Sequence, residues 1–136
     1  MILRKKHGNI ISGTEKRIAF AINSEGNNYF IPSCKAIYRE FWPELLLMRN
    51  IKIGTVLSKE IDGITYFALC CYSLERGWEN QQEIIKKCFD SIPGSEPIVS
   101  VDIGNSWLEK SCGANIYQIR AGMIASKAEI ILYLSK

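Results

Sequence analysis

The chain has 136 residues, of which 47% are hydrophobic and 23% charged, and its formal net charge is +3 at pH 7. This length and composition predict a single globular domain, residues 1–136, with enough apolar side chains for a core. The only compact basic run is Arg4-Lys5-Lys6, so a nucleic-acid partner is not expected.

Membrane segments, disulfide frameworks and metal sites are not expected either. No apolar run approaches the ~20 residues that a membrane helix requires, and Met1-Ile2-Leu3 is followed too early by charge for a signal peptide. The five cysteines form no C-x-x-C pair, and His7 is the single histidine. We therefore expect a cytoplasmic protein without metal or cofactor, and the sequence leaves the oligomeric state open.

The first half of the chain favours strands. They are expected at residues 2–6, 17–22, 55–59 and 64–71. The second segment is apolar without alternation, which is typical of a strand covered on both faces. Asp62-Gly63 separates the last two strands and predicts a hairpin. Between the second and third strands, Ser33 as N-cap and Pro43 as terminator bound a short helix, and residues 44–48 can add a turn.

The second half of the chain alternates helices and strands. Residues 79–92 repeat apolar side chains on one helical face, with Lys86 and Lys87 on the other. A strand at residues 99–103 comes next, and residues 130–134 form a last strand. Between these two strands lies a second amphipathic stripe, formed by Ile116, Ile119, Met123 and Ile124.

This order of elements predicts an α/β fold, a three-layer α/β/α sandwich with a mixed central sheet. In open sheets of this class, ligands bind beyond the carboxyl ends of the central strands. The candidate ligand-binding loops are therefore those that follow Ile22, Cys71 and Ile103.

Residues 99–115 run from a strand through a glycine-bearing loop into a helix. Gly104 and Gly113 permit close backbone approach, and the helix start supplies N–H donors, so the loop suits a phosphate. The same glycines can simply turn the chain and open the helix. Asp102 and Glu109 are candidate catalytic acids that orient water, since both lie in or beside this loop. Alternatively, Asp102 caps a turn and Glu109 is solvated.

Two further groups of side chains are candidates for nucleotide contacts. Asn23 and Asn27 follow a buried strand, where carboxamides can bond ribose hydroxyls or stabilise a turn. Tyr72, Arg76 and Trp78 can provide a stacking surface and a cation. For Trp78, packing in the core is the commoner role.

Three short motifs carry a resemblance to a known family. Gly8-Asn9-Ile10 resembles the family's Gly-Asp-Ile after its first strand, and residues 18–23 resemble the strand that ends in its asparagine loop. Ile103-Gly104, Gly113-Ala114-Asn115, Ser126 and residues 130–133 resemble its C-terminal phosphate loop, helix and last strand. Through the order and spacing of these motifs, nearly the whole chain resembles a diverged macro domain, the ADP-ribose-binding module.

The resemblance implies a macro-domain-like sandwich that binds ADP-ribose. Asn9 would meet the adenine, the asparagine loop the distal ribose, and the C-terminal glycine loop the diphosphate. The implied ligand contacts are Asn9, Ile10, Asn23, Asn27, Gly104, Asn105, Gly113, Ala114 and Asn115. The chain departs from the family in three places: Asn9 replaces an acid, no glycine-rich run follows the asparagine loop, and the loop from Gly104 to Gly113 is longer and more charged.

Three functions follow as hypotheses. The first is binding of ADP-ribose or a related nucleotide diphosphate, as a reader of ADP-ribosylated protein, which the abundant carboxamides favour. The second is a hydrolase that removes ADP-ribose from protein, or a phosphatase acting on an ADP-ribose phosphate, with Asp102 and Glu109 as its catalytic acids. The third is a protein-interaction module without a ligand.

Overall fold

The computed structural model describes residues 1–8, 10, 15–26, 37–73, 75–94, 96–100 and 113–134. The helices and strands within these residues are β1 (Ile2–His7), β2 (Arg17–Asn23), η2 (Ile37–Phe41), η3 (Pro43–Leu47), β3 (Val56–Ile61), β4 (Ile64–Tyr72), α2 (Gln81–Asp90), β5 (Ile98–Ser100), α4 (Ile116–Ala125) and β6 (Ile130–Leu134). The last two helices and five of the strands lie where the sequence predicts them, and β5 agrees with the strand predicted at residues 99–103 as far as Ser100, since residues 101–103 lie outside the described ones. The helix start predicted at Ser33 lies outside the described residues, and the part that is described is a π-helical turn followed by a 3-10 turn.

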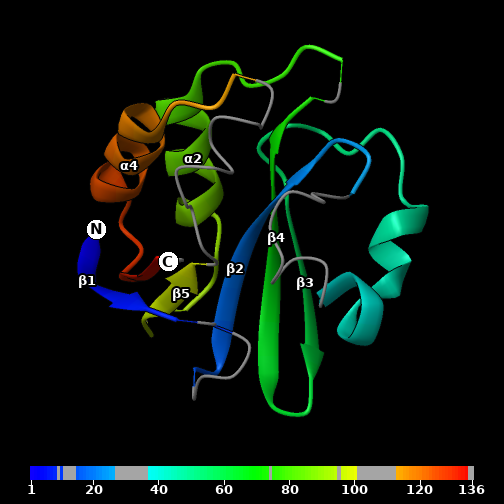
Figure 1. Ribbon diagram of the computed structural model, residues 1–136, viewed down its shortest axis with the longest axis horizontal. Helices are drawn as coiled ribbons and strands as arrows, with labels where there is room; N and C mark the ends of the chain where they lie inside the picture. Colours follow the sequence, from blue (N-terminus) through cyan, green and yellow to red (C-terminus); the bar gives the residue numbers. More distant parts are fainter. Residues whose placement is uncertain are drawn as a thin grey trace.

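The described strands form one six-stranded sheet in the order β1-β6-β5-β2-β4-β3. Neighbouring strands are parallel throughout, except that β3 is antiparallel to β4. The predicted mixed α/β architecture is therefore confirmed (Figure 1). Asp62 and Gly63 join β3 to β4 with φ of 51° and 79°, the positive values that a tight hairpin turn requires.

Strand β2 lies inside the sheet because its side chains are apolar on both faces. Ile18, Ala19, Phe20 and Ile22 are each at most 2% exposed, whereas a strand with one solvated face would alternate. The prediction of a strand covered on both faces is confirmed.

Adjacent residues of β4 contact different covering segments, as the pleat of a strand requires. Tyr66 stacks on Phe41 of η2, with ring centroids 5.5 Å apart. Phe67 lies under the guanidinium of Arg17 at 5.2 Å, and that guanidinium donates to the carbonyl oxygens of Pro93 and Glu96 beyond α2. Segments of the chain therefore pack against both sides of β4.

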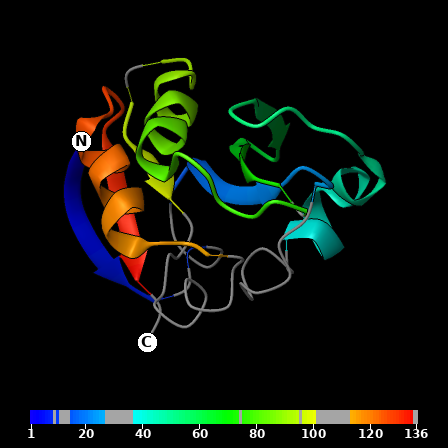
Figure 2. The same cartoon turned by 90° about the horizontal axis from the view of Figure 1, so that it is seen from above.

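Helices α2 and α4 lie side by side, on one side of β2, while η2 and η3 lie at the opposite end of the molecule (Figures 1 and 2). Gly122 allows the close approach, since a Cβ there would stand 2.5 Å from the carbonyl oxygen of Gln82. Ile119 and Met123 of the predicted stripe are buried. Ile124 is 64% exposed, so its assignment to that stripe is wrong: it lies about 100° around the helix from Met123.

No helix within the described ranges is long and apolar enough to cross a membrane.

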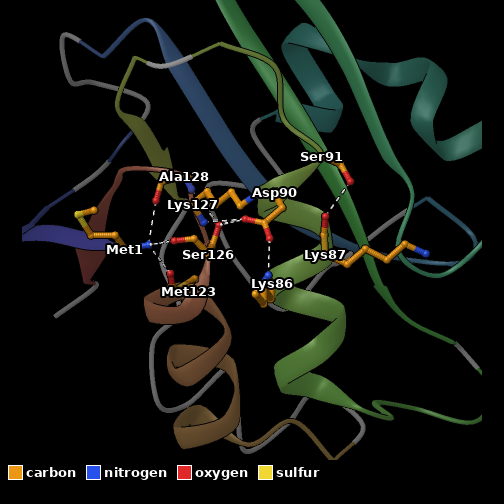
Figure 3. Close-up of polar contacts among 9 residues, drawn as sticks. All are labelled: Met1, Lys86, Lys87, Asp90, Ser91, Met123, Ser126, Lys127 and Ala128. Atoms are coloured by element: carbon orange, nitrogen blue, oxygen red, sulfur yellow. Dashed lines mark hydrogen bonds and ion pairs between the residues drawn. The ribbon is translucent and has the colours of Figure 1, made fainter.

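A polar network joins the C-terminal ends of the two helices (Figure 3). Asp90 of α2 accepts hydrogen bonds from Lys86 Nζ at 2.7 Å, from Ser126 Oγ at 2.8 Å and from the backbone N–H of Lys127 at 2.7 Å. The Met1 ammonium donates to three carbonyl oxygens beside it, which belong to Met123, Ser126 and Ala128. The ammonium thus donates to carbonyl groups at and just beyond the C-terminal end of α4, where a helix leaves carbonyls without intrahelical partners, and Asp90 accepts from the chain that follows.

Partial burial raises the pKa of the Asp90 carboxyl, but the hydrogen bonds from Lys86, Lys127 and Ser126 outweigh it and hold that pKa at about 2. A carboxyl whose pKa is lowered by folding stabilises the protein while it is ionised. This contribution is complete above the ordinary value of 3.8 and is lost as the pH falls to about 2.

We expect Asp90→Asn to lower the free energy of unfolding by about 1–2 kcal/mol at pH 7, because it removes a charged acceptor with three donors. Chemical denaturation of both proteins between pH 7 and pH 2 measures the difference, which should vanish toward pH 2. Glu83→Gln, at an exposed position of the same helix, is the control and should cost less. A difference for Asp90→Asn that does not change with pH would contradict this role.

Candidate functional site

The sheet reverses its direction of winding between β2 and β5. The chain leaves β2 toward η2 and β3, whereas it leaves β5 in the other direction, toward α4 and β6. The two strands are parallel neighbours, with Ile18 beside Val99, so both connections start from the same edge of the sheet. Ligands of open α/β sheets bind at such a switch point. This edge is therefore the candidate site.

Asn23 lies at the carboxyl end of β2, where the sequence places a ligand contact. It is 3% exposed, and its Oδ1 accepts from the N–H of Glu25 at 2.8 Å. Its carbonyl oxygen accepts from the N–H of Gly26 at 3.0 Å. This is an Asx turn, so the carboxamide stabilises the chain where it leaves the sheet. A ligand contact by Asn23 stays a prediction.

The segment Gly113-Ala114-Asn115 leads into α4 and is held by Gln81 at the start of α2. Gln81 is 7% exposed; its Nε2 donates to the Gly113 carbonyl at 3.0 Å, and its Oε1 accepts from the Asn115 N–H at 2.6 Å. Asn115 Oδ1 accepts from the N–H groups of Tyr117 and Gln118, and it is therefore the N-cap of α4.

The N-termini of α2 and α4 are thus joined through Gln81, just as their C-termini are joined through Asp90. The two helices are parallel, and their positive dipole ends lie together. Gly113 has φ of +86°, a value that favours glycine.

The remaining predicted contacts divide into two groups. Ile10 is 2% exposed and belongs to the core, and Ala114 is half-buried against that core. The other predicted residues lie outside the described ones: Asn9, Asn27, Asp102, Gly104, Asn105 and Glu109. Their roles stay predictions.

The rings of Tyr72 and Trp78 are buried and stack on each other, so they do not form an exposed surface on which a nucleotide base could stack. Their ring centroids are 5.0 Å apart with an interplanar angle of 13°, and they are 2% and 7% exposed. Packing of Trp78 in the core, the commoner role, is what the structure shows. The Arg76 side chain is 77% exposed and lies 3.8 Å from Glu79.

A pocket of about 520 Å³ lies where β2 and β4 end. Three loops line it, with the residues Ser24, Glu25, Asn50, Ile51, Lys52, Ile53, Ser73, Glu75 and Arg76. Sequence analysis had singled out only Arg76 among these. The sequence indicates the loop after β2 as a candidate. It does not indicate that residues 50–53 approach this loop, because that approach depends on a tertiary hydrogen bond from the Ile51 N–H to the Ser24 carbonyl at 2.9 Å.

Three of the described cysteines, Cys70, Cys71 and Cys88, are buried. Burial, with Cys88 nearby, raises the pKa of Cys70 to about 12. A hydrogen bond with Cys88, together with burial, also raises the pKa of Cys71. Thiolates are the nucleophilic form, so these residues pack as small apolar groups. The described parts of the chain hold no cluster of three or more His, Cys, Asp or Glu side chains able to bind a metal ion.

The strands and helices define a mixed α/β fold, and comparison with solved structures agrees with this fold. No family model and no curated protein matches the chain. A solved structure described as "Alphavirus P23pro-zbd" is similar over 95% of this chain and 21% of its own, with a TM-score of 0.60 and 13% sequence identity. At this identity the similarity shows the fold alone, and the chain spans about a fifth of that structure's length.

We expect Gln81→Ala to lower the free energy of unfolding by about 1–3 kcal/mol, because it leaves the Gly113 carbonyl and the Asn115 N–H without this partner. Urea denaturation measures the loss. Gln82→Ala, at the exposed neighbouring position, is the matched control and should change stability by less than about 0.5 kcal/mol. Equal effects of the two substitutions would show that Gln81 does not clamp α4.

We expect Asn23→Ala to lower the melting temperature, because it removes the oxygen that accepts from Glu25; the loss is about 1 kcal/mol. Asn23→Asp keeps an oxygen at that position and should lose less. Thermal unfolding of both variants at neutral pH makes the comparison. If the alanine variant is as stable as the aspartate variant, the Asx turn is not what Asn23 contributes to stability.

Proposed function

We propose that this chain binds ADP-ribose or a related nucleotide diphosphate beyond the carboxyl ends of β2 and β5, as a reader of ADP-ribosylated protein. The observation that carries the proposal is the switch point between these two strands, from which the asparagine-bearing loop and the glycine-bearing loop both leave. The two helix N-termini that Gln81 joins also favour an anionic group nearby.

The macro-domain resemblance gives this ligand its identity, and the fold supports it in outline. The helices beside one face of the sheet and the η2 contact on β4 support the three-layer sandwich that the resemblance implies. A cytoplasmic location belongs to the same proposal. Binding is favoured over catalysis because the sequence has many carboxamides in and beside these loops and offers no clear acid–base pair.

Isothermal titration calorimetry with ADP-ribose tests the proposal, and we expect saturable binding with a Kd below about 1 mM. AMP and ribose 5-phosphate, which each carry one part of the ligand, should bind more weakly. A thermal shift that grows with ADP-ribose concentration should accompany the heat. Absence of both heat and shift at millimolar ADP-ribose would refute nucleotide binding and leave the interaction module as the function.

A release assay separates the reader from the hydrolase. A reader binds an ADP-ribosylated protein without freeing ADP-ribose from it, whereas a hydrolase yields free ADP-ribose over time. If release occurs, Asp102→Ala and Glu109→Ala should slow it. Glu60→Ala is the control, because Glu60 is exposed and pairs with Thr65 at the opposite end of β4.

A further inference from the structure

Two pockets lie next to each other beyond β4, and we call the two together the groove. The pocket of about 520 Å³ shares Ile53, Ser73 and Arg76 with a second one of about 220 Å³. The second pocket extends to Asn80 and Ile84 of the α2 region. The groove therefore runs from the loop after β2, across the loop after β4, to the start of α2.

Backbone hydrogen bonds hold the walls of this groove. Ser24 N–H donates to the Tyr72 carbonyl at 3.0 Å, and Ile51 N–H donates to the Ser24 carbonyl at 2.9 Å. Ser73 and Gly77 exchange two backbone hydrogen bonds, and Ser73 Oγ accepts from the N–H of Arg76. A groove whose loops are tied together in this way is largely formed before a ligand binds, which lowers the entropic cost of binding.

The charges of the larger pocket are balanced. Its lining includes two acids, Glu25 and Glu75, and two bases, Lys52 and Arg76, among hydroxyl and isoleucine side chains. A surface that carries only positive charge favours a diphosphate. A lining with charges of both signs does not suit it. A peptide, which carries amide groups and side chains of either charge, matches a lining of this kind.

We propose that this groove is a peptide-binding site, which takes the segment of a target protein that carries an ADP-ribosyl group. The inference rests on the proposed function, because the proposed function places the nucleotide at the carboxyl ends of β2 and β5. Strand β2 ends at Asn23, and the next residue, Ser24, lines the groove. A peptide attached to the nucleotide extends across the end of β2 into the groove.

Calorimetry with two probes tests the inference: ADP-ribose, and a short peptide that carries one ADP-ribosyl group on a serine. The peptide conjugate should bind about tenfold more tightly than ADP-ribose, which corresponds to about 1.4 kcal/mol of additional binding free energy. Arg76→Ala should weaken binding of the conjugate about fivefold and leave binding of ADP-ribose unchanged. Arg76 is exposed, so the variant should fold, and its melting temperature checks this.

Arg39→Ala is the matched control, because Arg39 is an exposed arginine on η2 that lines neither pocket. It should leave both affinities unchanged. If both probes bind equally well, or if Arg76→Ala weakens both to the same extent or neither, the peptide site is refuted while nucleotide binding stands. If neither probe binds, the proposed function fails, and the peptide site fails with it.

Discussion

The parallel pairing of β2 with β4 on one side and with β5 on the other is the constraint on which this structure depends. A strand that is apolar on both faces avoids water only inside a covered sheet. Parallel neighbours cannot be joined by tight turns, so the chain must cross over between them. The crossovers leave β2 and β5 in opposite directions, and such a switch point is where ligands of open α/β sheets bind.

The two helices beside the sheet are fixed at both ends by buried or partly buried polar side chains. Gln81 joins the N-termini, and Asp90 joins the C-termini. Each bonds backbone groups of the neighbouring segment, which would be costly to leave unsatisfied. The helices therefore cannot slide along each other without breaking these bonds. Because Gln81 bonds Gly113 and Asn115, this constraint also positions the start of α4, where the predicted phosphate loop ends.

Sequence analysis predicted what depends on local periodicity and turn chemistry. The continuous apolar run of β2, the Asp62-Gly63 hairpin and the amphipathic pattern of α2 each follow from neighbours in the chain. Ile124 was assigned to a buried stripe because its spacing from Ile116 is helical, but burial depends on which face meets α2. The Gln81 clamp and the groove also escaped prediction, since they join segments that only the tertiary fold brings together.

Asparagines after a strand illustrate why site residues are harder to predict than elements. A carboxamide oxygen accepts from a backbone N–H in the same geometry as from a ligand donor, and Asn23 and Asn115 both use this oxygen locally, in a turn and in a helix cap. The sequence pattern is the same for both roles. These local hydrogen bonds are compatible with a binding role. A ligand that accepts from backbone N–H groups binds best when the loops that carry those groups are held in place.

The distribution of charge along this edge separates two kinds of recognition. Near β5 the proposed phosphate position would rely on backbone N–H groups and helix dipoles, which favour an anion whatever the side chains are. Near β4 the lining carries two acids and two bases, and fixed charges of both signs favour a ligand that is itself mixed. On the proposed function, an ADP-ribosylated protein would contact both environments at once, whereas free ADP-ribose would contact only the first. The end of β2, stabilised by Asn23, lies between the two environments and sets how the nucleotide and its attached chain would be aligned.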